Sequence, residues 1–531
     1  LLSGTPSFTA NATNGTTYTF SPSYKDGTPG TPITLIGQQN LTSNSFTISN
    51  HGSFNFQGVK LTTPTLNGVS TNLNAGPTGG NNTYGLFTFT GADSTVVGKV
   101  NNTNYQQFRV GDGVNPTTLH LSGFSLSNNW ATNVPPFFVI NQFGTVDNTT
   151  GNSNLTGSMA VVLNGGSLTN RGGGTFTAPG LITGYGLVSG PITVNGGLTA
   201  GPGTTSATSG TLTVDGTSTK GPITIGATGW GSSAGFTLDM KGTFNYPSTG
   251  GFLNPGNGTV QFDGATLNNT GQTIYTGAGK FVVNSGVNTF NTAMIPNGSN
   301  STVPDYTIKN GATLNVNNTN TSNNAIYAQN FTMENNSKLS VNGSNNVIQV
   351  AGNFLYSQTD KVNAWTYNGT AGLGPDLIMT GGAKGATPVQ LEAGSVNMGN
   401  KAAGYVDNFA LDKLTLTKDA YVNVVDMSDN ATPAANWHSG VEALYLDNLE
   451  GVSKATASGD IPTLNLDNLF GYVEVNGVST LLMDGLYTAA DGTVVNIINA
   501  APGPVPGAGL ASLAFLAVAG AWRRARSLLA R

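Results

Sequence analysis

The chain reads Tyr306-Thr-Ile-Lys-Asn-Gly-Ala-Thr-Leu-Asn-Val-Asn-Asn318 and repeats the pattern 25 residues later as Phe331-Thr-Met-Glu-Asn-Asn-Ser-Lys-Leu-Ser-Val-Asn-Gly343. Leu314 thereby matches Leu339, and Val316 matches Val341. In each copy apolar and polar residues alternate, and Asn-Gly or Asn-Asn pairs interrupt them. This pattern is typical of short strands joined by tight turns.

The repeat predicts the fold class. A sequence period of about 20–50 residues is typical of repeat proteins, and the lack of a helical apolar stripe excludes a helical solenoid. We therefore expect an all-β fold, a right-handed parallel β-helix (β-solenoid). Each turn would contribute about three short strands, whose inward residues stack on those of neighbouring turns.

Composition limits the class of protein further. Glycine makes up 74 of 531 residues, and only 8% of residues are charged. The 37% of hydrophobic residues, with 24 Phe and 16 Tyr, argue against a disordered chain. The absence of cysteine excludes disulfides, thiolate metal sites and thiol nucleophiles. A net charge of −5 with scattered cations argues against a nucleic-acid partner.

Spacing and charge divide the chain into four predicted regions. Strand-like segments are irregularly spaced at first, and residues 401–500 hold 13 acids but four lysines. The regions are an irregular N-terminal β region (1–150, early turns or a separate cap), a regular β-solenoid (151–355), acidic closing turns (356–500) and a C-terminal tail (501–531).

One glycine-punctuated segment carries a family resemblance. It runs from Leu181 through Gly-Tyr-Gly, Asn-Gly-Gly and Gly-Pro-Gly203, and Ser209-Gly-Thr-Leu-Thr-Val-Asp-Gly216 follows. This segment resembles the turns of autotransporter passengers and related secreted bacterial β-helix proteins. The resemblance implies a secreted β-helix and says almost nothing about activity. The chain shows no sign of the C-terminal barrel that an autotransporter would need.

The C-terminal tail combines three features. Residues 505–522 form an 18-residue stretch without a charge, which as a helix would be about 27 Å long, close to the thickness of a bilayer's hydrocarbon core. We therefore expect a hydrophobic tail helix that lies transiently in the inner membrane, with its arginines in the cytoplasm. The motif residues are Pro502, Pro504, Pro506, Arg523, Arg524 and Arg526.

This layout resembles the PEP-CTERM class of exosortase sorting signals. Gly503 stands where that family has an acidic residue between the prolines, so the recognition core differs from the family pattern. The resemblance implies a protein exported to the cell surface of a Gram-negative-type bacterium.

Catalytic residues are hard to find in the sequence. The three histidines, His51, His120 and His438, lie far apart, and none has a nucleophile motif beside it. His120 alternates with leucines and is expected to project from a strand face. Asp215, Asp239 and Asp263 are spaced by 24 residues, which is close to one turn, so they are expected to align on one face. Turn residues that bond their own backbone are the favoured interpretation of these aspartates.

No cofactor is expected, and Ca²⁺ has one weak candidate site. Asp426-Met-Ser-Asp-Asn430 is a short oxygen-rich loop whose candidate ligands are Asp426, Asp429 and Asn430. The loop lacks the full spacing of a calcium-binding loop, so a solvated turn is favoured.

Together these observations predict a non-catalytic extracellular structural or adhesive protein: a surface-layer, biofilm-matrix or adhesin protein that can self-assemble into filaments. Expected partners are other copies of the chain, cell-surface or matrix polysaccharide, and the membrane through the tail before processing. The alternatives are a polysaccharide lyase or glycosidase on the same scaffold, or a carbohydrate-binding protein that uses exposed aromatics such as Trp230 or Trp365.

Overall fold

The structure is a computed structural model in which the chain forms two compact units. Unit 1 comprises Leu1–Gln329 and Ser337–Asn346, and unit 2 comprises Asn330–Asn336 and Val347–Arg531. Seven strand backbones are described between residues 17 and 69. The structure also describes residues 85–499 except 92, 103–105, 129–137, 156–159, 173, 179, 218, 226–228, 247–250, 270–272, 297–301, 383–386, 429–441 and 454–459.

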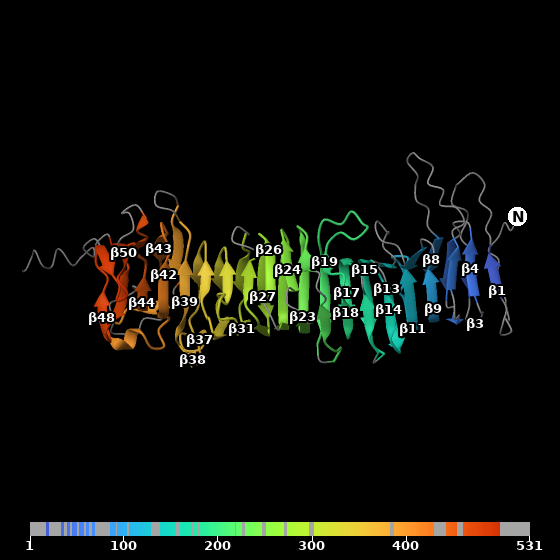
Figure 1. Cartoon of the computed structure of the whole chain (residues 1–531), viewed down its shortest axis with the longest axis horizontal. Helices are drawn as coiled ribbons and strands as arrows, with labels where there is room; N and C mark the ends of the chain where they lie inside the picture. The colour runs from blue at the N-terminus through green and yellow to red at the C-terminus, as the bar shows by residue number, and fades with distance from the viewer. Residues whose placement is uncertain are drawn as a thin grey trace, which may run out of the picture. The chain divides into compact units, whose positions relative to one another are not determined.

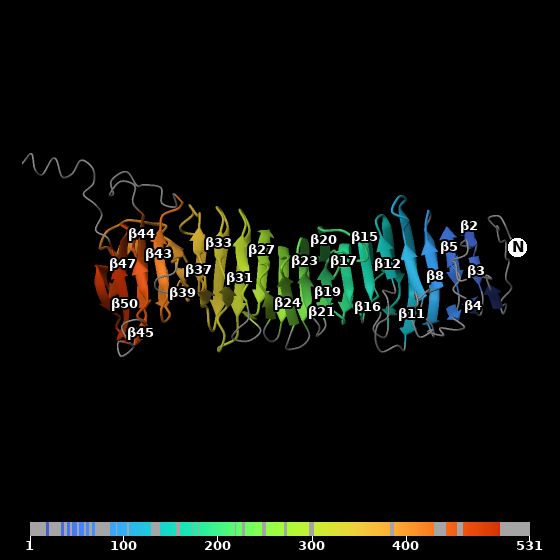
Figure 2. The ribbon, with the colours of Figure 1, turned by 90° about the horizontal axis from the view of Figure 1, so that it is seen from above.

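Unit 1 is a parallel β-solenoid, as predicted. Each strand pairs in parallel with its counterpart in the next turn, and Figures 1 and 2 show these strands side by side. The first row contains β2 (Ile33–Ile36), β5 (Ser53–Gln57), β8 (Gly85–Phe89), β10 (Gln106–Val110), β12 (Phe138–Asn141), β15 (Val161–Asn170), β17 (Ile182–Ser189), β19 (Leu198–Ala200), β22 (Trp230–Ser232), β24 (Gly251–Gly256), β26 (Thr273–Gly277), β29 (Met294–Pro296) and β32 (Ile326–Ala328).

Two further rows complete the turns, and long strands such as β15 and β17 run through more than one row. The second row contains β3 (Asn40–Thr42), β6 (Lys60–Thr62), β9 (Ser94–Asn102), β11 (Thr117–Asn128), β13 (Gly144–Thr150), β20 (Gly210–Gly216), β23 (Phe236–Tyr246), β25 (Thr259–Asn269), β27 (Lys280–Ser285) and β30 (Asp305–Ile308). The third contains β14 (Ser153–Leu155), β16 (Phe176–Ala178), β18 (Ile192–Val194), β21 (Ile223–Ile225), β28 (Val287–Asn291), β31 (Thr313–Asn318) and β34 (Lys338–Gly343), and β1 (Thr17–Phe20), β4 (Ser45–Ser49) and β7 (Leu66–Val69) form a separate parallel sheet.

The repeat in the sequence corresponds to vertical registry in the structure. Leu314 lies opposite Leu339 and Val316 opposite Val341 in the β31–β34 pair, and all four side chains are buried. Turn length varies elsewhere, because Ile182 pairs with Leu198 and Leu198 with Trp230. A constant period is therefore visible only where successive turns have equal length.

Parallel pairing also continues through the irregular N-terminal region, where β5 pairs with β8 and β8 with β10. The choice between early turns and a separate cap stays open. The predicted boundaries at residues 150 and 355 stay predictions.

The core of unit 1 is built from vertical stacks of inward-facing residues. Leu212, Leu238, Val260, Phe281 and Tyr306 are successive register partners on five turns, and each is buried. Alternation places every second residue of a strand in this core, so each turn covers the apolar face of its neighbour.

The expectation that Trp230 and Trp365 are exposed is wrong. Trp230 is 0% exposed and lies opposite Leu198 and Leu253 in unit 1. Trp365, in unit 2, is 1% exposed, and its ring centroid lies 4.9 Å from that of Tyr356. Both indoles occupy inward positions because their area stabilises the core, so neither offers a platform for a saccharide.

A ladder of asparagine side chains links four turns of unit 1. The amide of Asn268 donates to Asn245 at 3.1 Å, Asn291 donates to Asn268 at 2.8 Å, and Asn317 donates to Asn291 at 2.8 Å. Amides both donate and accept, so identical residues can stack without the repulsion that charges would cause.

Replacing Asn268 with alanine breaks this ladder at two hydrogen bonds. We expect unit 1 to lose about 1 kcal/mol of stability, because these bonds are half-buried. Asn154→Ala is the matched control, since Asn154 is an exposed strand residue. Chemical denaturation of the two variants measures the difference, and equal midpoints would contradict a stabilising ladder.

Unit 2 contains two parallel rows and several antiparallel strand pairs. The rows are β33 (Phe331–Met333), β36 (Phe354–Tyr356), β40 (Val389–Glu392), β43 (Tyr421–Val425), β46 (Thr463–Asn465) and β50 (Thr493–Ile498), and β35 (Ile348–Val350), β39 (Gly374–Met379), β42 (Leu411–Leu416), β44 (Glu442–Glu450) and β47 (Phe470–Val475). The antiparallel strands are β37 (Trp365–Tyr367) with β38 (Thr370–Ala371), β41 (Ser395–Val396) with β44, β45 (Val452–Ser453) and β49 (Gly485–Thr488) with β50, and β48 (Val478–Leu481) with β47. One 3₁₀ helix, η1, spans Ala402–Gly404.

The predicted tail helix falls outside the described residues, together with Pro502, Pro504, Pro506, Arg523, Arg524 and Arg526. Among the residues that the structure does describe, no helix is long and apolar enough to cross a membrane.

Candidate functional site

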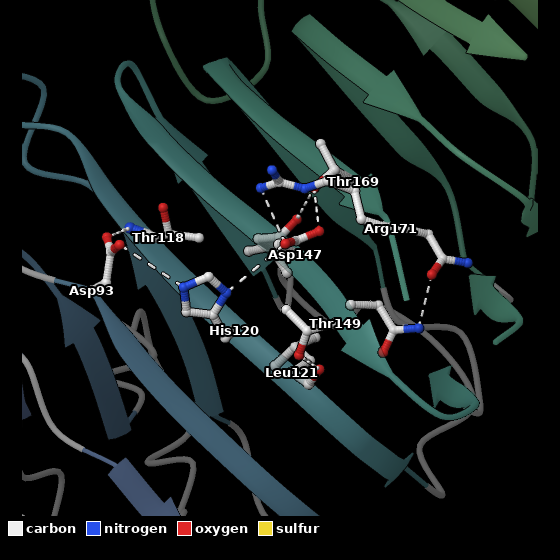
Figure 3. A network of polar contacts seen from close by, with 11 residues as sticks. Asp93, Thr118, His120, Leu121, Asp147, Thr149, Thr169 and Arg171 are labelled. Atoms are coloured by element: carbon white, nitrogen blue, oxygen red, sulfur yellow. Dashed lines mark hydrogen bonds and ion pairs between the residues drawn. The ribbon is translucent and has the colours of Figure 1, made fainter. Parts of the chain in front are cut away.

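A network of charged and polar side chains spans successive turns of unit 1 between residues 93 and 171 (Figure 3). His120 lies between two carboxylates: its Nε2 is 3.8 Å from Oδ2 of Asp93, and its Nδ1 is 3.8 Å from Oδ2 of Asp147. Asp147 is buried and also binds Arg171 at 3.1 Å and the Thr169 hydroxyl at 2.7 Å. These contacts link strands β11, β13 and β15, which belong to successive turns.

The position of His120 confirms the sequence interpretation, because it projects between the buried Leu119 and Leu121. His51 and His438 lie outside the described residues. The ion pair between Arg171 and Asp147 carried no signal in the sequence. It arises only because β13 and β15 pair with Asp147 opposite Thr169, two residues before Arg171.

Asp215, Asp239 and Asp263 do not form the straight ladder that their spacing predicts. Asp215 lies opposite Lys241, while Asp239 lies opposite Thr213 and Gln261. The reason is that the first turn is two residues longer, and the second two residues shorter, than the spacing of the aspartates.

The three aspartates nevertheless gather around Lys241. Lys241 Nζ lies 3.2 Å from Oδ2 of Asp239, and Asp239, Asp263 and Asp215 all raise the pKa of Lys241, although partial burial opposes them. Four charged groups from adjacent turns therefore meet on one face.

The environment drives the pKa values of Asp239 and Asp263 apart. Burial and the neighbouring Asp263 raise the pKa of Asp239 to about 6. Asp263 is partly buried, but hydrogen bonds from Ser285 at 2.6 Å and Asn284 at 2.8 Å hold its pKa below the usual value. Asp239 is therefore the more easily protonated of the two carboxyl groups. Pairs of acids with separated pKa values are one sign of acid–base sites.

Three carboxylates in unit 2 form the group, within the described residues, that could hold a metal ion. Ligand oxygens of Glu392, Asp426 and Glu442 lie within 4.8 Å of one another. Burial raises the pKa of Glu392 to about 7, although the amides of Met427 and Ser428 donate to it at 3.0 and 2.9 Å. The structure thus places Asp426, a sequence candidate for Ca²⁺, beside two buried glutamates from other turns. Asp429 and Asn430 lie outside the described residues.

A row of acids crosses successive turns of unit 2 as well. Asp412 and Asp376 lie on the paired strands β42 and β39, and burial and Asp376 raise the pKa of Asp412 to about 7. Burial and Glu474 raise the pKa of Asp447, on the next strand β44, to about 6. The sequence showed the excess of acids but not this alignment.

No family model matches the chain, and the comparisons found no similar curated protein and no similar solved structure.

Proposed function

We propose that the chain is a non-catalytic structural or adhesive protein of the extracellular surface or matrix, and that its turns provide mechanical and proteolytic resistance. The observation that carries the proposal is the unbroken parallel pairing within unit 1, where buried stacks and amide ladders hold each turn to the next. Backbone amides that are paired on both sides of a turn resist proteases and local opening.

The surface chemistry supports the same proposal. Charged residues make up only 8% of the chain, and outward positions such as Asn268, Thr289 and Asn315 are uncharged hydrogen-bonding groups. Such rows suit contacts with saccharides or with another β-sheet. We therefore propose matrix polysaccharide and other copies of the chain as partners.

The proposal also covers the handedness of the solenoid, the route of export and the location of the protein. We propose right-handed coiling, export through a PEP-CTERM-like tail at residues 501–531, and retention at the surface of a Gram-negative-type bacterium. Electron microscopy of cell extracts tests assembly: filaments that carry the chain are expected, and monodisperse particles at high concentration would contradict filament formation. Deletion of residues 501–531 should lower the amount of the protein in the cell-surface fraction.

Polysaccharide processing is the alternative that one observation favours. Asp239, Lys241 and Asp263 meet on one face of unit 1 with separated pKa values. Release of reducing ends from acidic polysaccharide by purified protein, lost in Asp263→Asn and kept in the control Asp305→Asn, would establish it. Equal release by all three proteins would exclude this site.

Calcium binding is proposed at Glu392, Asp426 and Glu442. Saturating Ca²⁺ should stabilise unit 2 by about 2–3 kcal/mol at one hundred times the dissociation constant. Glu392→Gln should abolish the shift, whereas Glu334→Gln should keep it, because Glu334 lies outside the group. Calorimetry with and without Ca²⁺ measures the effect, and an unchanged melting temperature of the wild type would contradict the proposal.

A further inference from the structure

The third row of unit 1 repeats a short polar pattern on successive turns. The pattern is a polar residue, an apolar residue and an asparagine, and it occurs in Thr243-Phe-Asn245, Thr266-Leu-Asn268, Thr289-Phe-Asn291, Asn315-Val-Asn317 and Ser340-Val-Asn342. These segments lie opposite one another in β23, β25, β28, β31 and β34. Each apolar residue is buried, and the polar residues are partly exposed. We call these polar residues the third-row face.

Strand geometry fixes the spacing of the polar groups on this face. Neighbouring strands lie about 4.8 Å apart, and residues two apart on one strand are separated by about 6.6 Å. The face therefore presents two parallel columns of uncharged groups, one of asparagines and one of hydroxyl and amide side chains. The asparagine column continues on earlier turns as threonines, because Thr224 lies opposite Asn245, Thr193 opposite Thr224 and Thr177 opposite Thr193.

The asparagine ladder orders one of these columns in advance. Asn268, Asn291 and Asn317 each donate one side-chain N–H to the asparagine one turn before. A side-chain amide has two N–H donors and an oxygen with two acceptor positions, so the ladder uses only part of what each amide offers. A partner can bond to this column without breaking the ladder, and side chains that are already ordered lose little entropy when they bind.

The chemistry of the face restricts the class of partner. Among the described outward positions of the third row between residues 153 and 343, Lys338 is the one charged residue and Val287 the one exposed large hydrophobic residue. Nucleic acids and acidic polymers attract cations, and membranes attract apolar side chains. The charged clusters around His120 and Lys241 lie on the second row instead. An uncharged polymer rich in hydroxyl groups, which both donate and accept, fits the third-row face.

We propose that the third-row face binds an extended, uncharged polysaccharide whose chain runs along the columns, across successive turns. Sugar hydroxyls replace water on Thr243, Thr266 and Thr289 and on the remaining donors and acceptors of the asparagine amides. Each turn repeats the same pair of groups, so one polymer bonds to several turns at once and weak contacts combine. This inference rests on the proposed surface or matrix function, since it specifies the saccharide class and the face that would serve it.

Co-sedimentation of the full chain with microcrystalline cellulose and with chitin powder tests the face. T243V/T266V/T289V removes three hydroxyls with little change in shape, and it should weaken binding at least ~10-fold. The matched control T211V/T237V/T259V changes three threonines that are register partners on the second row, and it should bind like wild type. Raising NaCl from about 0.05 to 1 M should leave binding unchanged, because the contacts carry no charge. Circular dichroism melting reports whether each variant is folded.

Four results would overturn the inference, each in a different way. Equal binding by T243V/T266V/T289V and the control would leave a polysaccharide partner in place but on another face. Competition by alginate, or loss of binding at high salt, would assign binding to the charged second row. Self-association of wild type without polysaccharide, lost in T243V/T266V/T289V, would assign the face to a second copy. Wild type that binds neither probe would remove the saccharide partner, whereas filaments in cell extracts test the structural function separately.

Discussion

Replacing Gly184 with alanine is expected to destabilise unit 1 by about 3 kcal/mol or more. Gly184 lies in β17 with a φ of +122°, and a Cβ atom there would lie 1.9 Å from the carbonyl oxygen of Leu163 in the neighbouring turn. That oxygen belongs to paired backbone, so it cannot move without breaking the β15–β17 ladder. Urea denaturation followed by circular dichroism measures the loss.

Gly113→Ala separates the two causes of this loss. Gly113 also has a positive φ, +82°, but a Cβ atom there would meet nothing within 4 Å. Its replacement should cost only the backbone strain, about 1–2 kcal/mol. If the two variants lose the same stability, close approach between turns does not explain the glycine at residue 184.

This glycine shows what the sequence could predict. Gly184 and Gly186 belong to the Gly-Tyr-Gly pattern that suggested a β-helix, and both lie where a side chain would strike the turn beside them. The alternation around Leu314 and Val316 likewise predicted which residues are buried. Both signals are local, because they depend on strand geometry within one turn.

The candidate sites depend on pairing between turns of unequal length, which local patterns do not encode. Lys241 reaches Asp239 along the same strand, β23, but Asp263 comes near both through a register that differs from the constant spacing of the aspartates. Glu392 and Glu442 join Asp426 although long segments separate them. Trp230 was misjudged for another reason: it stands in a short Gly-Trp-Gly segment with no alternation to show which face it occupies.

Asp412→Asn is expected to make unit 2 more stable at pH 8 and to leave its stability nearly unchanged at pH 4. Burial first, and then Asp376, raise the folded-state pKa of Asp412 from its ordinary value of 3.8 to about 7. A carboxyl with a raised pKa contributes fully below its unfolded pKa, and the contribution is lost as the pH rises through the folded pKa. The wild-type stability of unit 2 should therefore fall between pH 4 and pH 7.

The expected gain at pH 8 is about 2 kcal/mol. Three pKa units correspond to about 4 kcal/mol, and we halve this value because Asp412 is only partly buried and solvent screens its charge. Asp360→Asn is the matched control, since this acid of unit 2 is separate from the row and partly exposed. Melting temperatures of the wild type and both variants, measured from pH 4 to pH 8, test this prediction. If Asp412→Asn gains no stability relative to Asp360→Asn at pH 8, the burial of a charged Asp412 beside Asp376 does not limit the stability of unit 2.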